Sequence, residues 1–491
     1  MTTPHHRHPV HSHAKATSSD GNDAATLEEG PAAKSEASPL VPSKSRTSAW
    51  QHHDHLSMMD EGVDSEQKQS FNLCGKWVMR PQLLPYRKEW WMLGLLLIVG
   101  LAVWGYNGIS PHLKQHPHGV VFVEDAKEYR LDLPPDKDDG TASQDENVPL
   151  QLWFRVWGRV DGTGIPLLFV HGGPGNAIAD YFGNSNQRFF GSKSDPADED
   201  PFQFMVVEVD QRGTGNSQPS IRDGWQNMKY YEDISITKMV ADFEVVRKFL
   251  GIDQWLVWGG SFGSTLAIYY GELYPNSCLG LVLRGIYLDT AEEVGVVYAK
   301  ETYVDNPKRL HEFNILYQYA ADYANDNQHG SDKEPLDPND AERILRLYAE
   351  MITSGDKMAA WHWFVFENNL MELDPKRILD PYHIHEKYYR ESLSVAFFET
   401  RLWLHGSYEF PTSDLLDETK IQQLTMPMWI CQGQRDEVCP PQYARKFLDA
   451  VVKEDRSPQV VARFLNATHE DTDPAIATCL KLSLEEFVQH G

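Results

Sequence analysis

The chain has 491 residues, 41% of them hydrophobic, which is enough for one large domain with attachments or for two domains. Its formal net charge of −26, from 45 basic and 71 acidic residues, argues against nucleic acid as a partner, because phosphate binding needs a basic surface. The five cysteines form no Cys-x-x-Cys pair, so no structural zinc site and no dense disulfide framework are expected. Cys431, which lies in an apolar run, is interpreted as a buried thiol.

Residues 1–75 lack hydrophobic periodicity and are rich in serine, alanine, histidine and acidic residues. Such a composition cannot bury enough apolar surface to offset the entropy of ordering, so it predicts a disordered tail. The histidine clusters of this segment could hold a transition metal weakly, but a polar flexible tail is the preferred interpretation.

An uncharged apolar run at residues 90–106 predicts one transmembrane helix, which we place at residues 88–109. About 17 helical residues span roughly 25 Å, and aromatic residues lie at both ends of the run, where they prefer the membrane interface. Basic residues precede the run and only Lys114 follows it closely, so the positive-inside rule predicts a cytosolic N-terminus and a lumenal or extracellular C-terminal part. A cleaved signal peptide is disfavoured because it should begin near Met1, and a buried core helix is the alternative.

From residue 120 onward, short apolar runs alternate with helical patterns, which predicts βαβ units and a mostly parallel sheet with flanking helices. Residues 289–418 break this pattern with helical, aromatic-rich sequence. We therefore expect a core in two parts, residues 120–288 and 419–491, separated by a helical cap. The runs expected as strands are 166–170, 204–209, 255–258, 279–283, 428–431 and 460–464.

Ser261 lies at the centre of residues 259–263 (GGSFG), between the apolar run 255–258 and a helical pattern. This is the strand–turn–helix context of a nucleophile elbow, a turn so sharp that small residues must flank the serine. The N-terminus of the following helix also favours developing negative charge. A tight turn without catalytic function is the alternative.

A serine nucleophile needs a base, and the base needs an orienting acid. Asp436 follows the apolar run 428–431 and His469 follows the run 460–464, which gives the chain order serine, acid, histidine of this class of hydrolase. Glu437 is the rival acid, and a surface position for His469 is the alternative.

Residues 171–175 (HGGPG) follow another expected strand, and their glycines let the backbone approach a ligand closely. We expect the backbone N–H groups of Gly173 and Phe262 to form an oxyanion hole. A plain glycine turn is the alternative. A Walker-type phosphate loop is excluded because no Gly-Lys-Ser/Thr follows.

Four segments together resemble the proline iminopeptidases, over roughly residues 120–491. The resemblance implies an α/β-hydrolase fold with a helical cap. It also implies metal-free and cofactor-free release of N-terminal proline from peptides with a free N-terminus, through an acyl-enzyme. The segments are residues 171–175 (HGGPG), 210–217 (DQRGTGNS), 259–267 (GGSFGSTLA) and 283–285 (LRG).

The same resemblance implies that carboxylates of the cap read the free amine, and it points to Glu367 and Glu399. The chemistry is consistent, since a buried ammonium needs an opposite charge and an aromatic-lined pocket suits a small cyclic amine. A surface or helix-face position is the alternative for each glutamate. Arg284 is expected to support the carboxylates or the substrate.

The chain departs from the family pattern at three positions, which affects the strictness of proline preference more than hydrolysis. Phe262 and Phe366 stand where the family usually has tryptophan, and Ala467 stands where it usually has glycine. Two other functions remain open: a membrane-anchored esterase or amidase of the same fold, and a non-catalytic interaction domain. The cap glutamates disfavour a lipid pocket, and the complete set of serine, acid and histidine disfavours a non-enzyme. An epoxide hydrolase is disfavoured, because its nucleophile would be a carboxylate at the position of Ser261.

Overall fold

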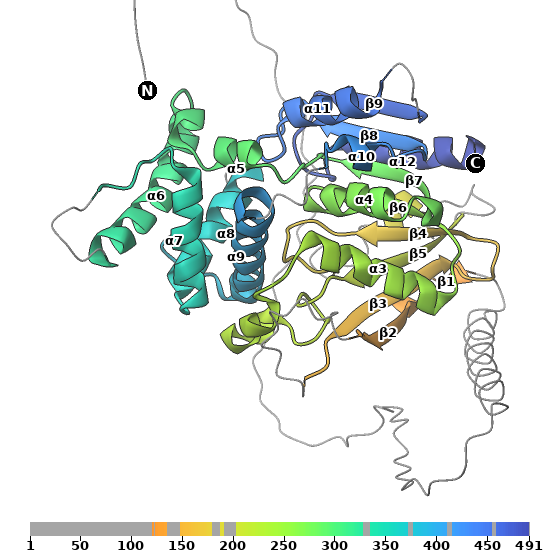
Figure 1. Ribbon diagram of the computed structural model, residues 1–491, viewed down its shortest axis with the longest axis horizontal. Coiled ribbons are helices and arrows are strands. Elements are labelled where there is room, and N and C mark those ends of the chain that lie inside the picture. The colour runs from red at the N-terminus through yellow and green to blue at the C-terminus, as the bar shows by residue number, and fades with distance from the viewer. Residues whose placement is uncertain are drawn as a thin grey trace, which may run out of the picture. The chain divides into compact units, whose positions relative to one another are not determined.

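The computed structural model describes residues 120–121, 123–134, 148–178, 187–190, 203–327, 334–371, 377–409, 415–453 and 458–490 (Figure 1). The expected tail and the expected transmembrane helix lie outside these residues. Within them, no helix is both long and apolar enough to cross a membrane. The strands are β1 (Val120–Val121), β2 (Lys127–Asp132), β3 (Gln151–Arg159), β4 (Ile165–Val170), β5 (Phe204–Asp210), β6 (Trp255–Gly260), β7 (Cys278–Arg284), β8 (Met428–Gly433) and β9 (Val460–Leu465).

Helices connect the strands in the core and make up the segment between β7 and β8. The α-helices are α2 (Gln187–Phe190), α3 (Ile236–Leu250), α4 (Phe262–Leu273), α5 (Ala291–Val297), α6 (Pro307–Asn327), α7 (Ala341–Thr353), α8 (Lys357–Met371), α9 (Tyr389–Trp403), α10 (Glu418–Ile421), α11 (Pro441–Val451) and α12 (Pro474–His490). The short helices are η1 (Val123–Asp125), η3 (Ile221–Asp223), η4 (Trp225–Tyr231), η5 (Pro275–Ser277), η6 (Lys300–Tyr303), η7 (Glu386–Tyr388) and the π-helical η8 (Leu404–Glu409).

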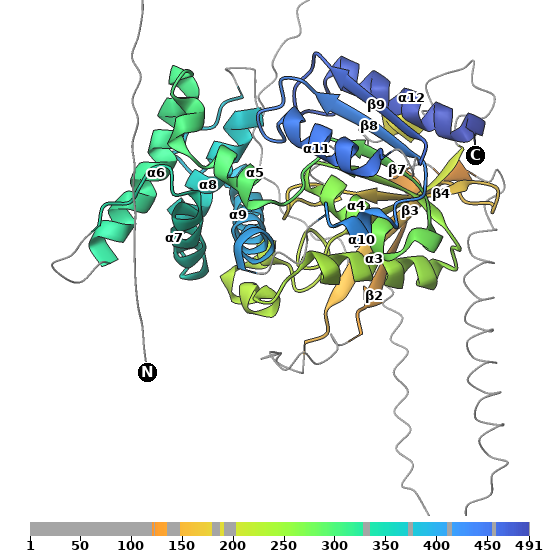
Figure 2. The same cartoon turned by 45° about the horizontal axis from the view of Figure 1, so that its top comes forward.

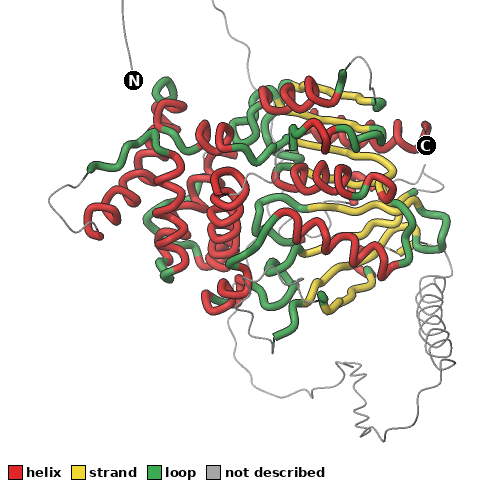
Figure 3. The backbone as a smooth tube through the Cα atoms, viewed as in Figure 1, coloured by secondary structure: helices red, strands yellow, loops and turns green. Residues whose placement is uncertain are grey.

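The strands form one sheet in the order β1-β3-β5-β4-β6-β7-β8-β9, with β2 also paired to β3 (Figure 3). All neighbours from β5 to β9 run parallel, whereas β1, β2 and β5 each pair with β3 antiparallel. Every residue of β5, β6 and β8 is buried, which explains their continuous apolar sequences, since a parallel sheet is covered on both faces. The prediction of a mostly parallel sheet with flanking helices is confirmed.

Helices cover both faces of the sheet (Figure 2). Residues of α3, α4 and α11 belong to one hydrophobic cluster, and residues of α2 and α12 belong to a second cluster on the opposite face. Two cysteines of the second cluster, Cys431 of β8 and Cys479 of α12, form a disulfide. The interpretation of Cys431 as a buried thiol is therefore wrong: the fold brings together two residues separated by 48 positions, a contact that local sequence does not reveal.

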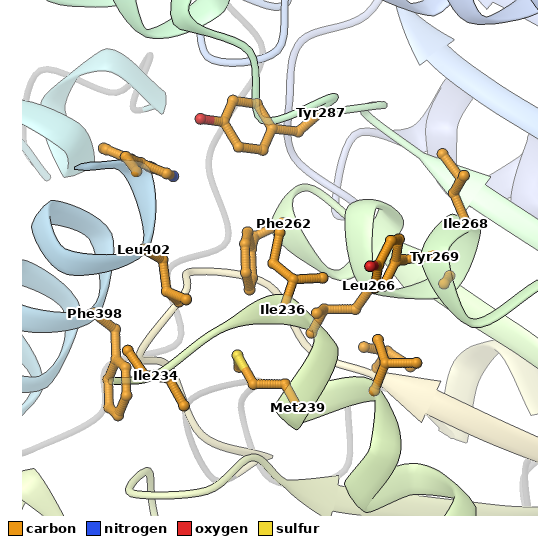
Figure 4. Packing of buried hydrophobic residues seen from close by; sticks show 14 of the residues in the cluster. Ile234, Ile236, Met239, Phe262, Leu266, Ile268, Tyr269, Tyr287, Phe398 and Leu402 are labelled. Carbon is orange, nitrogen blue, oxygen red and sulfur yellow. The ribbon is translucent and has the colours of Figure 1, made fainter. Parts of the chain in front are cut away.

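Helices α5 to α9 form the cap between β7 and β8 and lie beside one end of the sheet (Figure 1). The cap shares its apolar interior with the first cluster of the core. Phe398 and Leu402 of α9 belong to the same cluster as Ile234 and Phe262, and Figure 4 shows these side chains facing one another. The cap therefore packs directly over the N-terminal end of α4, which Ser261 precedes.

Candidate active site

Ser261 joins β6 to α4. Its backbone has φ 57° and ψ −133°, a conformation that residues other than glycine rarely adopt. Such a backbone costs on the order of 1–3 kcal/mol and persists only where the surrounding structure enforces it. Here the Ser261 N–H donates to the Arg284 carbonyl at 2.8 Å, and the Ser264 N–H and hydroxyl each donate to the Ser261 carbonyl at 2.7 Å. These hydrogen bonds fix the turn that holds Ser261 between the end of β6 and the start of α4.

Glycine is required on both sides of Ser261 for steric reasons. A side-chain carbon at Gly259 would lie 2.1 Å from the carbonyl oxygen of Gly263, and one at Gly263 would lie 2.4 Å from that of Val170. Both distances are far below contact, so helix α4 can approach the ends of β6 and β4 only because neither residue has a side chain. The sequence prediction of small residues flanking the turn thus has a direct steric cause.

His469 and Asp436 meet through the pairing of β8 with β9, which aligns Gly433 with Leu465 and so places the two following loops side by side. His469 Nδ1 lies 2.9 Å from Asp436 Oδ2, and both residues are buried. With a carboxylate at Nδ1, that nitrogen carries the proton and Nε2 is left to accept one. The backbone N–H groups of Val438 and Cys439 donate to Asp436 Oδ1 at 3.0 and 2.7 Å and fix the carboxylate.

Glu437, the rival acid, has a different partner. Its Oε2 accepts from Arg309 Nε of the cap at 2.8 Å, and its side chain is 45% exposed. Of the two candidate acids, Asp436 is the one bonded to His469.

Arg284 lies at the end of β7, where the pairing of Gly260 with Arg284 places it beside the elbow. Its Nη1 donates to the backbone carbonyl of His469 at 2.6 Å, and a side chain at Gly260 would collide with the guanidinium. Arg284 therefore fixes the backbone of the candidate base relative to the elbow, and it also lines the large pocket described below. This contact adds a positioning function that the sequence did not suggest.

The glycine-rich loop of residues 171–175 comes directly after β4, and Gly173 lines the same pockets as Ser261. Gly173 has φ 112°, a conformation that favours glycine. The Gln211 side chain donates to the His171 carbonyl at 2.8 Å, and the Gln211 N–H donates to His171 Nε2 at 3.2 Å. The loop is thus held rigidly over the N-terminal end of α4, where Phe262 is the first helical residue.

The DQRG motif has a structural explanation of the same kind. Asp210 accepts from the N–H groups of Ile178 and Asn216 at 2.7 and 2.8 Å, and Arg212 forms a bidentate, buried ion pair with Asp242 of α3. The motif therefore fastens the loop after β5 to both the glycine-rich loop region and α3.

Glu367 of α8 and Glu399 of α9 are both buried inside the cap. The Tyr298 hydroxyl donates to Glu367, and Trp363 Nε1 donates to Glu399 Oε2 at 2.6 Å. The rings of Tyr298 and Trp363 stack with centroids 4.6 Å apart, so an aromatic wall accompanies the two carboxyl groups.

Burial raises the pKa of Glu367, and burial together with the charge of Glu367 raises the pKa of Glu399. Two carboxyl groups in one dry site destabilise each other's charged form. A bound cation would relieve this repulsion, so the electrostatics of the cap favour a positively charged ligand.

Two pockets meet at Ser261. The large one has a volume of about 420 Å³ and is also lined by Arg284, Glu399 and His469. The small one has a volume of about 30 Å³ and lies between the elbow and the cap. Gly173, Ser261, Glu367 and Val438 line both pockets.

The walls of the small pocket consist mainly of residues that sequence reasoning missed. Most of them are ordinary apolar and aromatic residues without a motif, so no sequence signal distinguishes them from the core. The residues are Tyr287, Glu293, Val294, Val297, Tyr298, Trp403 and Cys439.

Comparison with known families places this arrangement in a class. The family described as the alpha/beta hydrolase fold matches residues 165–451, which is more than half of the chain. The chain therefore belongs to the α/β-hydrolase fold family.

Curated relatives narrow the assignment within that class. A proline iminopeptidase of Neisseria meningitidis serogroup A is 28% identical over 345 residues, covering 69% of this chain and 93% of the relative. One of Arabidopsis thaliana is 31% identical over 294 residues (59% and 65%), and one of Xylella fastidiosa is 27% identical over 300 residues (60% and 80%). The resemblance to the proline iminopeptidases is confirmed, and with it the class of enzyme, a serine hydrolase.

Proposed function

We propose that the protein is a serine aminopeptidase that releases an N-terminal proline, or another small residue, from peptides. The observation that carries the proposal is the pair of buried glutamates, Glu367 and Glu399, in the pockets that contain Ser261. In the proposed complex these carboxylates bind the substrate amine while the carbonyl of the first residue lies at Ser261.

In the proposed reaction Ser261 attacks the carbonyl carbon of the first residue, and His469 Nε2 takes the hydroxyl proton. Asp436 holds the imidazole in the tautomer that accepts this proton and stabilises the imidazolium that forms. The N–H groups of Gly173 and Phe262 stabilise the oxyanion. His469 then protonates the leaving amine, and water, activated by the same histidine, hydrolyses the acyl-enzyme.

The cap carboxylates also argue against the first alternative. An esterase or lipase acyl pocket would have to bury an uncharged chain against Glu367 and Glu399, which leaves their charges uncompensated. The second alternative, a non-catalytic interaction domain, is disfavoured by the presence of the candidate nucleophile, base and acid together.

The test uses the purified full-length chain with a proline aryl-amide and a short-chain aryl ester. We expect cleavage of the amide by the wild type and a loss of at least about 10³-fold in Ser261→Ala. Ser354→Ala, at the exposed C-terminal end of α7, is the control and should retain activity. Amide cleavage that survives in Ser261→Ala contradicts the mechanism, and ester cleavage without any amide cleavage contradicts the aminopeptidase assignment.

We further propose that residues 88–109 anchor the chain in a membrane, with the N-terminus cytosolic and the catalytic part lumenal or extracellular. The basic residues before the apolar run support this orientation. The Cys431–Cys479 disulfide also supports it, because disulfides persist in oxidising compartments. Protease treatment of intact vesicles should remove the tail of a cytosolic N-terminus and leave residues 120–491 protected; digestion of the catalytic part instead contradicts the orientation.

A further inference from the structure

The segment Asn466-Ala467-Thr468, directly after β9, is the only Asn-x-Ser/Thr sequence in the whole chain, and this is the acceptor sequence for N-linked glycosylation. Strand β9 is an edge strand of the sheet (Figure 1). From the sequence alone we expect this asparagine to be shielded by the fold and unmodified, because a glycan so close to the candidate base His469 would obstruct the site.

The three residues of this acceptor sequence differ in exposure. Asn466 is exposed, whereas Ala467 is fully buried and Thr468 is only 8% exposed. The side-chain amide of Asn466 forms no hydrogen bond with any residue that the structure describes. The acceptor side chain is therefore accessible from solvent, and the expectation that the fold shields it is wrong.

The backbone of this segment is fixed against the end of β8. The Ala467 carbonyl accepts from the Arg435 N–H at 2.9 Å. A side-chain carbon at Gly433 would lie 2.3 Å from the Thr468 carbonyl oxygen, so the two chain segments approach each other closely. With Ala467 and Thr468 packed inward, the side chain of Asn466 is left on the outer surface.

A glycan on Asn466 is compatible with an open substrate pocket. The large pocket is lined by the four residues from His469 to Thr472, but not by Asn466. His469 itself is 6% exposed and bonded to Asp436 inside the fold. A sugar attached to Asn466 therefore begins outside the pocket walls and leaves the candidate base accessible from the pocket.

We propose that Asn466 carries an N-linked oligosaccharide. The inference rests on the proposed orientation, in which the catalytic part is lumenal or extracellular, because this modification belongs to secreted and lumenal chains. The Cys431–Cys479 disulfide supports the same oxidising compartment, and its two cysteines lie on either side of Asn466 in the sequence.

The modification joins the side-chain nitrogen of Asn466 to the anomeric carbon of an oligosaccharide carried on a lipid diphosphate. As the new C–N bond forms, the bond between that carbon and the diphosphate oxygen breaks. The lipid diphosphate leaves with the electron pair of that bond, and the amide nitrogen loses one proton. The acceptor sequence requires the hydroxyl of Thr468, which the fold buries, so the transfer takes place before this segment has packed. The exposed position of Asn466 then allows the glycosylated chain to fold.

The experiment expresses the full-length chain in a eukaryotic host, isolates it with the membranes and treats it with peptide N-glycosidase. We expect the wild type to gain electrophoretic mobility by the mass of one glycan, and peptide mass spectrometry to find aspartate at position 466, which this enzyme leaves behind. Asn466→Gln and Thr468→Val should show no shift. Thr468→Ser keeps the acceptor sequence and should show the same shift as the wild type.

Asp161→Asn is the matched control, because it turns residues 161–163, which connect β3 to β4, into a second acceptor sequence ending at Thr163. Gly162 and Thr163 are exposed, so this turn has room for a sugar. Combined with Asn466→Gln, the control reports the orientation of the catalytic part independently of Asn466, and we expect it to show the shift.

A shift that persists in Asn466→Gln alone places the sugar on another residue and overturns the inference. An unshifted wild type beside a shifted control also overturns it and leaves the proposed orientation intact. No shift in either chain overturns the inference and the orientation together. Cleavage of the prolyl aryl-amide is a separate measurement, so a failure of the proposed aminopeptidase function is distinguished from all of these results.

Discussion

Glu367 and Glu399 have the environment least favourable to their own charges among the candidate site residues. Each is buried and has one neutral hydrogen-bond donor, from Tyr298 and Trp363 respectively. In the empty site this arrangement destabilises the protein relative to one with neutral residues, because the carboxylates lose their hydration. Under the proposed function, a substrate ammonium would compensate both charges.

Replacing Glu367 by glutamine keeps the shape of the side chain and removes its charge. We expect kcat/KM for the prolyl aryl-amide to fall by about 30–150-fold, equivalent to roughly 2–3 kcal/mol for a charge-assisted interaction, and kcat/KM for an N-blocked ester to change by less than about 3-fold. Glu350→Gln, on the exposed face of α7, is the control for a cap glutamate. Equal losses on both substrates would show that Glu367 does not bind the amine.

The raised pKa of Glu367 also predicts a pH dependence that only amine substrates show. A raised pKa means that the carboxylate is neutralised at a higher pH than a surface glutamate, so acidification weakens ammonium binding early. His469 affects both substrates alike, and the ratio of kcat/KM for the prolyl amide to that for the N-blocked ester isolates the effect. This ratio should fall as the pH is lowered from about 8 to about 5. The fall should be smaller in Glu367→Gln, where Glu399 titrates without the charge of Glu367 beside it, and an undiminished fall there points to another group.

The residues of the site differ in how far sequence alone indicates them. Ser261, Asp436 and His469 follow from chain order and from their positions after strands, and the structure brings Asp436 and His469 into contact. The sequence does not indicate that Tyr287 and Trp403 line a pocket, because the sequence around an aromatic residue in a pocket wall does not differ from that around one in the core. The function of Arg284 in holding His469 is likewise visible only in three dimensions.

Among the elements, a buried arginine adds polar contacts between the cap and the core to their shared apolar packing. Arg309, at the start of α6, donates to the carbonyls of Asn369 and Leu370 at the end of α8 and to Glu437 of the loop that carries Asp436. An arginine is suited to this because its planar fork serves several acceptors at once, and a cation stabilises the C-terminal end of a helix.

Arg309→Ala should therefore lower the free energy of unfolding by about 3 kcal/mol, because it leaves buried carbonyls unpaired and Glu437 without its partner. Arg309→Lys should recover only a minor part of the loss. Lys453→Ala, which removes an exposed ion pair with Glu418, should change the same quantity by less than about 0.5 kcal/mol. Urea unfolding measures all three, and a loss in Arg309→Ala no greater than that in Lys453→Ala would exclude Arg309 as the cap's anchor.

The parallel strands could be predicted because burial on both faces makes them continuous apolar runs. Strand β3 was not predicted from the sequence, because Arg155 and Arg159 interrupt its apolar residues. In the fold Arg155 forms an ion pair with Glu208 of β5 at 2.5 Å, so its charge is compensated by a strand that comes some 50 residues later. Sequence periodicity cannot anticipate such a partner.

For the whole molecule, the Cys431–Cys479 disulfide closes the segment that carries both Asp436 and His469, with a sequence separation of 48. Reduction should lower the free energy of unfolding by about 2–4 kcal/mol, chiefly because the unfolded chain gains freedom. Thermal unfolding with and without reductant tests this. The double variant Cys431→Ala/Cys479→Ala should unfold at a lower temperature than the wild type and show no response to reductant. A response of the same size in that variant would mean that the disulfide is not its source.

The central claim is that Ser261 is the nucleophile of an active serine hydrolase, and covalent labelling tests it most directly. A fluorophosphonate reacts only with a serine activated by its base, and peptide mass spectrometry locates the adduct. The account predicts one adduct on the peptide that contains Ser261, with loss of amidase activity in proportion to labelling, and almost no adduct in His469→Ala. Full inactivation with the adduct on another residue, or an active protein that Ser261 labelling does not inactivate, would contradict it.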